Sequence, residues 1–257
     1  MSGYKIIATH KDIVYVYDGS LAGFFCCVHE SIYEKEFPIS IVNEKEIQPT
    51  LYEQKYIDTN PEKAVKVRNS INKNISTRTL ELTEITFLCH HEDKEIALLS
   101  FLLTAFRLGA KTPYMMGKAE VAKVVDMEKH IGGEAHLLKG FIRFADYGNI
   151  LGATISPKNF VLPLLAEHFI NRFPEENFII YDKTHKAALV YQDKSVEITA
   201  VEEIEFQQES ETELHYQALW KQFYKTIGIA ERLNPKCRMT LMPKRYWENM
   251  LEMREFL

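Results

Sequence analysis

The spacing of apolar residues changes near residue 132, and this change constrains the fold more than any other feature. Before it, apolar side chains recur every three or four residues, as in 93–108 and 118–131. After it, apolar and polar residues alternate over short runs, as in 150–155 and 187–191. The first spacing is typical of amphipathic helices and the second of strands. The sequence therefore predicts an α+β fold, in which a mainly helical N-terminal half packs on a small antiparallel sheet with an intervening helix and a C-terminal helix.

The same change suggests where the chain divides. With 257 residues and 46% hydrophobic composition, the chain is long enough for one large or two small cores at about 150 residues per domain. We expect an N-terminal strand and helical region over 1–131. The sheet, a helix and a basic C-terminal segment follow over 132–257. The two regions could also form one compact unit.

In the first region, helix-start signals mark most elements. An apolar alternation from Ile13 to Tyr17, followed by Asp18, Gly19 and Ser20, predicts a strand, a turn and a helix over 21–34. The segment 44–56 is weakly patterned and predicts a loop or a short strand. Asn60 before Pro61, and later Ser76, are typical helix caps. The segment 93–108 is apolar almost all round, so we expect it to be the buried central helix of this half, ending at Gly109.

In the second region, glycine and proline mark the boundaries. Gly132 and Gly133 are expected to interrupt the helix over 118–131 or to loosen its packing. Runs over 140–145 and 150–155 around a turn predict a β-hairpin. The other elements expected are a helix over 158–173 with Pro163 in its first turn, strands over 177–181, 187–191 and 196–201, and a helix over 211–229.

The sequence argues against a membrane or secreted protein. Its longest strongly apolar stretch, Ile96 to Leu108, includes Ser100, Thr104 and Arg107 and is shorter than the ~20 residues that cross a bilayer. The first residues contain Lys11 and Asp12 where a signal peptide would be apolar. Four cysteines, two of them adjacent, suit a reducing compartment. We therefore expect a cytoplasmic protein with no membrane contact.

Several common sites have no matching motif. The chain lacks a phosphate loop, a dinucleotide fingerprint, a zinc-protease helix motif and an esterase serine motif. Cys89, His90 and His91 are adjacent, but consecutive helical side chains diverge by about 100° and cannot share one tetrahedral site. We expect a buried cysteine with helix-end histidines there, no metal site and no bound cofactor.

One group of residues could carry acid–base chemistry. Glu134 and His136 precede Arg143 at an expected helix-to-strand junction. The first two could act as general acid and base, and Arg143 could clamp a phosphate or carboxylate. These three are the candidate catalytic residues. The alternative is structural: Glu134 or Asp146 pairs with Arg143 while His136 packs.

A second cation of interest lies on the expected helix over 158–173. Arg172 follows His168 by four residues, so the two side chains could approach one ligand. Alternatively, Arg172 caps the helix end against its dipole and His168 packs in the core.

The C-terminal basic segment, 232–247, is the strongest candidate for a nucleic-acid surface. It contains five cations and no acid, whereas the acidic stretch over 193–213 has eight acids and one lysine. Cations can contact phosphates and neighbouring aromatic rings can stack on bases. The net charge of −5 therefore hides two opposite blocks. With Arg172, the candidate nucleic-acid-binding residues are Arg232, Lys236, Arg238, Lys244, Arg245, Tyr246 and Trp247. Alternatively, the segment docks on the acidic stretch with Trp247 in the core.

Five motifs from the N-terminus to residue 247 resemble a bacterial family of uncharacterised proteins described as DNA-metabolism or DNA-repair proteins and linked to a radical-SAM partner. The resembling stretches are Tyr17–Ser20 with Gly23 and Phe24, Gly132–His136, Gly140–Phe144, Leu162–Phe169 with Arg172 and Phe173, and Glu231–Lys236 with Pro243–Trp247. Some relatives carry a uracil-DNA glycosylase domain after the last of these stretches. Because this sequence stops there, we do not expect glycosylase activity.

The resemblance implies a DNA-metabolism factor, with DNA and a radical-SAM protein as partners. It supplies no catalytic residues, so the site residues above rest on their own chemistry. Two alternatives remain: an enzyme that acts on a nucleotide or damaged base through Glu134 and His136, and a structural protein-interaction module.

Overall fold

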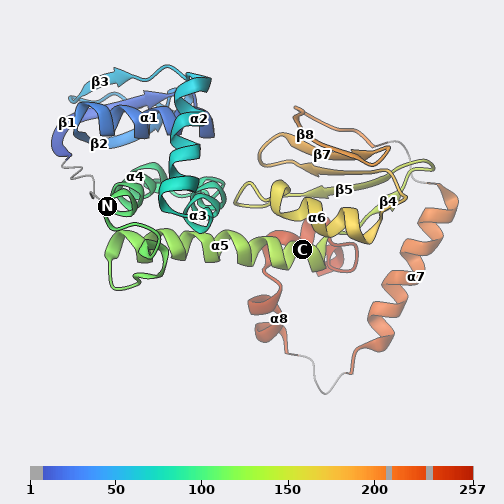
Figure 1. Ribbon diagram of the computed structural model, residues 1–257. Helices are drawn as coiled ribbons and strands as arrows, with labels where there is room; N and C mark the ends of the chain where they lie inside the picture. Colours follow the sequence, from blue (N-terminus) through green and yellow to red (C-terminus); the bar gives the residue numbers. More distant parts are fainter. Residues whose placement is uncertain (1–7, 207–209, 230–233, 257) are drawn as a thin grey trace. The chain divides into compact units, whose positions relative to one another are not determined.

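The computed structural model describes residues 8–206, 210–229 and 234–256. The chain groups into two compact units, 1–131 and 132–257. Both contain helices and a sheet (Figure 1). The α+β fold class predicted from the sequence is therefore confirmed. That the two units are separate domains stays a prediction.

The first unit contains a parallel three-stranded sheet in the order β2-β1-β3. Its strands are β1 (Thr9–Tyr17), β2 (Glu36–Asn43) and β3 (Glu53–Tyr56). Helix α1 (Leu21–Glu34) connects β1 to β2, and Ser20 caps it by accepting a 2.9 Å hydrogen bond from the amide of Gly23. The predicted strand, turn and helix are thus confirmed, with the helix over the predicted residues.

Strand β2 was not expected from the sequence. From the sequence, Pro38 indicates only that the preceding helix has ended. In the structure it lies within β2. In the structure β2 is an edge strand, where a proline is tolerated because no further strand needs its missing amide hydrogen.

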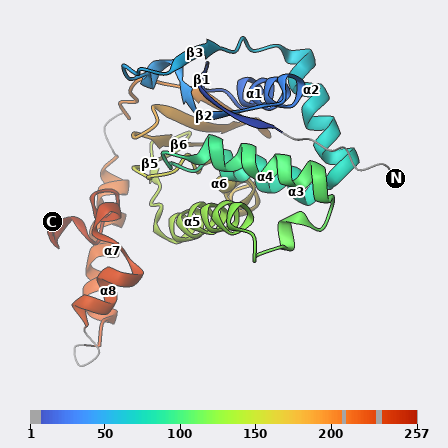
Figure 2. The ribbon, with the colours of Figure 1, turned by 90° about the vertical axis from the view of Figure 1, so that its left-hand side faces the viewer.

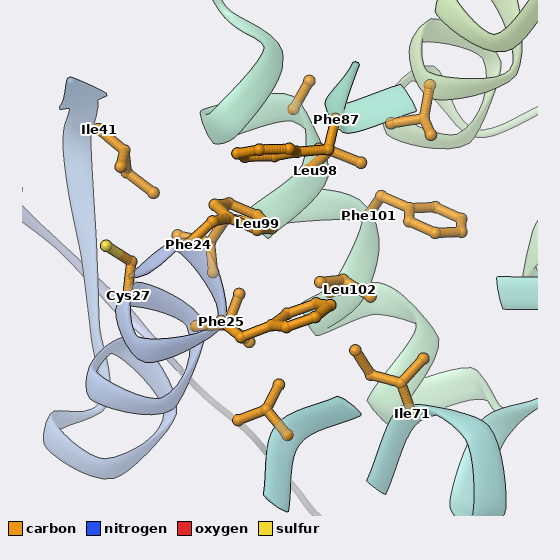
Figure 3. Close-up of a cluster of buried hydrophobic side chains, with 14 of the residues drawn as sticks. Phe24, Phe25, Cys27, Ile41, Ile71, Phe87, Leu98, Leu99, Phe101 and Leu102 are labelled. Atoms are coloured by element: carbon orange, nitrogen blue, oxygen red, sulfur yellow. The ribbon is translucent and has the colours of Figure 1, made fainter. Parts of the chain in front are cut away.

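Helices build the core of the first unit: α2 (Pro61–Ser70), α3 (Thr77–Phe87) and α4 (Lys94–Leu108), with a π-helical turn over Ile71–Ile75. Helices α3 and α4 lie side by side (Figure 2). Figure 3 shows Phe24 and Phe25 of α1 among the leucines of α4 and Phe87. Leu98, Leu99 and Leu102 are fully buried, which confirms α4 as the central helix of this half.

The second unit contains a five-stranded mixed sheet in the order β4-β5-β6-β7-β8. The strands are β4 (Ala145–Asp146), β5 (Leu151–Ile155), β6 (Phe178–Asp182), β7 (Ala187–Gln192) and β8 (Ser195–Ala200). The expectation of a purely antiparallel sheet is wrong for one pair, because β5 and β6 are parallel. Helix α6 (Leu162–Arg172) connects them, and such a crossover is how parallel neighbours are joined. Pro163 lies in its first turn, as predicted.

Helix α5 (Ala119–Phe141) corrects two further expectations. Gly132 and Gly133 do not interrupt it, and the strand expected over 140–145 shrinks to the two residues of β4. The glycines are exposed, whereas Ile131, Ala135 and Leu138 form a buried stripe. Burial of that stripe outweighs the low helix propensity of glycine.

The chain continues through α7 (Glu211–Ile227) and α8 (Pro235–Leu241), then through 3-10 turns over Lys244–Asn249 and Arg254–Phe256. Shorter 3-10 turns over Glu44–Glu46 and Thr112–Tyr114 lie in the first unit. Among the described residues, no helix is both long and apolar enough to cross a membrane.

Candidate functional site

Glu134 lies on α5 at the centre of a buried hydrogen-bond network. Its side chain is 3% exposed. Its Oε1 accepts hydrogen bonds from the amide of Lys158 at 2.9 Å and the hydroxyl of Tyr246 at 2.8 Å. Its Oε2 accepts from the amide and the side chain of Asn159, at 2.8 and 2.6 Å. The carboxylate therefore fastens the turn before α6 and the C-terminal basic segment to α5.

These contacts keep Glu134 ionised. Burial alone would raise the pKa of this carboxyl, but the hydrogen bonds from the amides of Lys158 and Asn159 outweigh it and hold the pKa below its ordinary value. A carboxylate with both oxygens already engaged is poorly suited to taking a proton from a substrate. His136, two residues along the same helix, is exposed. The structure thus does not bring the proposed acid and base together.

Arg143 forms a second charged cluster with Glu252 and Trp220. Its Nη2 lies 2.6 Å from Glu252 Oε1, and its Nε donates to Glu252 Oε2 at 3.3 Å. Trp220 donates its indole N–H to the same oxygen at 3.1 Å, and the guanidinium lies 5.5 Å from the Trp220 ring. Burial would raise the pKa of Glu252, but the hydrogen bond from Arg143 outweighs it and keeps the pKa below its ordinary value. The partner of Arg143 is therefore Glu252, not Glu134 or Asp146.

The aromatic residues of the C-terminal basic segment are buried, so base stacking is not their role in this structure. Tyr246 and Trp247 are each 2% exposed. The Trp247 indole donates to the carbonyl of Met242 at 2.9 Å. Rings this buried cannot stack on bases in this structure. The alternative interpretation, in which Trp247 lies in the core, agrees with its burial.

Instead, cations of that segment lie over the two rings. Arg238 lies 5.3 Å and Lys244 5.5 Å from the Trp247 ring centroid, and Arg245 lies 4.6 Å from that of Tyr246. Such cation–π contacts position the charges and leave them able to attract an anion. Phe256 lies on Arg238 as well, at 4.8 Å.

Arg238, Lys244 and Arg245 lie on these rings. We take them together with two exposed lysines, one before them on α8 and one in the turn before α6, and name the five the basic surface: Lys158, Lys236, Arg238, Lys244 and Arg245. Lys158 belongs to it because its amide and the Arg245 guanidinium approach the same oxygen of Glu134, at 2.9 and 3.4 Å. Lys236 is exposed on α8. Arg232 falls outside the described residues.

Arg172 is distant in sequence from most of the basic surface, and its described contact is with a different ring. It is exposed at the end of α6, and its guanidinium lies 5.6 Å from the ring of Phe173. Burial, together with the nearby charges of Lys139 and Arg172, lowers the pKa of His168. The charged form of His168 is therefore disfavoured.

The acidic stretch does not neutralise the basic surface in the described structure. Glu202 pairs with Lys186, and Glu213 accepts a hydrogen bond from the amide of Asp146. Arg245 is paired with Glu134 at 3.4 Å. Within the described ranges, no carboxylate over 193–213 forms an ion pair with the basic surface.

The described residues contain no group of three or more histidine, cysteine or acidic side chains that could hold a metal ion. Cys89 is buried, as expected under the structural interpretation of Cys89, His90 and His91.

Sequence reasoning did not find Asn159 or Glu252. Each completes a network around a residue that it did find, Glu134 and Arg143. Asn159 follows a proline by two residues and precedes a phenylalanine, and Glu252 lies in a short acidic–basic run near the C-terminus. Neither position has a pattern that marks it as buried.

A family model described as a domain of unknown function, DUF4130, matches residues 92–252, well over half of the chain. The match includes Glu134, Arg143 and the basic surface. No curated protein and no solved structure matches the chain. The chain belongs to the DUF4130 family.

Proposed function

We propose that this protein is a DNA-metabolism factor that binds the phosphate backbone of nucleic acid through its basic surface and presents the nucleic acid to a radical-SAM partner enzyme. The observation that carries the proposal is the placement of Arg238, Lys244 and Arg245 on the rings of Trp247 and Tyr246.

The charge of this surface supports a polyanionic ligand. Lys158, Lys236, Lys244 and Arg245 are exposed. Among the described cations on this surface, Arg245 alone forms an ion pair, with a single carboxylate. Lysine and arginine side chains that neutralise phosphates release counterions, so clustered cations bind nucleic acid without reading its sequence.

The DNA-metabolism setting and the radical-SAM partner rest on the family resemblance. A protein partner would also need an apolar surface. Helix α7 has one, since Tyr216, Leu219, Phe223 and Ile227 lie along one side of the helix and are all exposed. Exposed apolar patches of this kind often mark protein interaction sites.

The binding test compares two double variants that remove the same charge. Lys236→Ala with Lys244→Ala removes two exposed cations of the basic surface, and Lys63→Ala with Lys66→Ala removes two exposed lysines of α2. Fluorescence anisotropy with a duplex oligonucleotide gives affinity against salt concentration. We expect the first pair to weaken binding about tenfold and to reduce the slope of log affinity against log salt by about 0.9 for each lost contact. The second pair should leave both unchanged.

Equal losses for the two pairs would show that the contacts are not located on the basic surface. Absence of binding at low salt, together with no association with a radical-SAM enzyme in a pull-down, would contradict the proposal as a whole.

A further inference from the structure

Beside Arg143, the second unit has an open cavity of about 100 Å³ that the proposed phosphate contacts do not use. Strands β4 and β5, helix α7 and the C-terminal turns contribute its walls. Its polar lining consists of Arg143, Thr154, Glu213, Gln217, Asn249 and Arg254.

An aromatic pair forms another wall of the cavity. The rings of Tyr147 and Phe206 are stacked, with centroids 4.9 Å apart and planes 13° from parallel. They lie directly on Gly152 of β5, where a Cβ atom would come within 2.5 Å of Phe206 and 2.7 Å of Tyr147. Any side chain at residue 152 would displace them, so a glycine is what keeps this wall in place.

The charges around the cavity balance. Arg143 is neutralised by Glu252 at 2.6 Å. Glu213 and Arg254 contribute one negative and one positive group to the lining. A cavity with balanced charge and polar and aromatic walls suits a neutral, planar ligand better than a phosphate or a carboxylate.

Two side-chain amides offer recognition of such a ligand. Gln217 donates its Nε2 to Glu213 at 2.9 Å, and Asn249 donates its Nδ2 to Ser156 at 3.2 Å. Each of these two lining residues also has a side-chain carbonyl oxygen, which can accept a hydrogen bond. Glutamine and asparagine side chains pair well with the edges of nucleobases, and aromatic rings stack on their faces.

The size of the cavity narrows the ligand further. Its volume of about 100 Å³ is small beside the roughly 300–1,000 Å³ of sites that take drug-sized ligands. The cavity therefore suits a single ring better than a whole nucleoside.

We infer that this cavity binds a neutral, single-ring heterocycle of the pyrimidine-base class, through Gln217 and Asn249 at its edge and the Tyr147 and Phe206 wall. The base could be free or part of a nucleic-acid strand. If the base is part of a strand, the inference rests on the proposed function and adds a base site to it. If the base is free, the inference does not depend on the proposed function.

The test measures binding of free cytosine by saturation-transfer NMR, with benzoate as a charged ring of similar size. A ligand this small should bind in the millimolar range. Gln217→Ala should weaken cytosine binding about 3- to 10-fold through the loss of one hydrogen-bonding group. Gln222→Ala, on an exposed side of the same helix, should leave it unchanged.

Equal binding of benzoate and cytosine, no detectable cytosine binding, or equal affinities of the two glutamine variants would overturn the inference. Single-stranded oligonucleotides with and without one abasic site then identify the source. If Gln217→Ala weakens binding of the intact oligonucleotide as well as of free cytosine, but not of the oligonucleotide with the abasic site, the base comes from a strand. If it weakens binding of free cytosine and of neither oligonucleotide, the base is free. Cytosine binding that survives Lys236→Ala with Lys244→Ala separates this inference from the proposed phosphate contacts.

Discussion

Glu134 shows how a residue that looks catalytic in sequence can be an anchor in the folded chain. It accepts hydrogen bonds from Lys158, Asn159 and Tyr246, which come from two distant parts of the chain. A buried carboxylate with this many donors contributes stability only while it is ionised.

We therefore predict that Glu134→Gln destabilises the second unit in a pH-dependent way. At pH 7 the variant should lose about 2–4 kcal/mol, because an amide group replaces a charged acceptor and places its own N–H near backbone donors. The folded pKa of Glu134 is lowered, so the stability that it contributes is present above its unfolded pKa of about 4.3 and is lost as pH falls through the folded pKa. Urea unfolding at pH 7 and near pH 3 checks this.

The control is Glu167→Gln, which changes an exposed carboxylate on α6 and should alter the free energy of unfolding by less than about 0.5 kcal/mol. A difference between wild type and Glu134→Gln that stays constant with pH would count against the assigned role.

The sequence identified Glu134, Arg143 and Arg245 as residues of interest, but not what they contact. Their partners lie far away in the chain: Glu252 is 109 residues from Arg143, and Tyr246 is 112 residues from Glu134. No local pattern encodes such a pairing. Likewise, a tyrosine and a tryptophan beside cations in a sequence could stack on bases or form cation–π contacts with those cations. Only the burial of the rings distinguishes these two roles.

At the scale of elements, local signals predicted caps and apolar stripes well. The caps at Ser20, Asn60 and Ser76 all accept amide hydrogen bonds in the structure. The errors occurred where packing outweighs propensity, as at the glycines of α5, and where strands pair at a distance, as for β2 beside β1 and β6 beside β5. Strand direction depends on the crossover helix, which a period of two does not reveal.

Replacing the glycines of α5 by alanine should stabilise the protein, whereas the same replacement at a crowded glycine of α1 should destabilise it. A Cβ added at Gly132 or Gly133 meets no atom within 4 Å. Gly132→Ala with Gly133→Ala should therefore stabilise the protein by about 1–2 kcal/mol, because alanine restricts the unfolded chain and favours the helix. Gly23→Ala, in α1, should do the reverse, since its Cβ would lie 2.3 Å from Asp18 Oδ1 and 2.7 Å from Thr59 Oγ1, and Thr59 donates a hydrogen bond to the Asp18 carboxylate. Thermal unfolding of the three proteins measures both effects. A loss of stability in the α5 variant would mean that these glycines serve a contact that the structure does not show.

At the scale of the whole molecule, each unit has its own buried apolar side chains. The first unit has a core cluster around α4 and α1 (Figure 3). In the second unit the buried side chains include Leu165 and Phe169 of α6, Phe178 of β6, and Met250 and Met253. We propose that these units are two domains, the N-terminal over 1–131 and the C-terminal over 132–257, that unfold in separate steps.

Calorimetry of the full chain should then show two transitions, each sensitive to substitutions in one unit only. Leu102→Ala leaves a cavity in the first unit and should cost about 2–5 kcal/mol, which lowers one transition by roughly 10 °C. Glu134→Gln should lower the other transition and leave the first in place. Distant sites with no shared partners add independently, so the double variant should lower both transitions by the same amounts as the single variants. If either substitution moves a single common transition, the chain unfolds as one cooperative unit, and the division at residue 132, which lies inside α5, does not separate two domains.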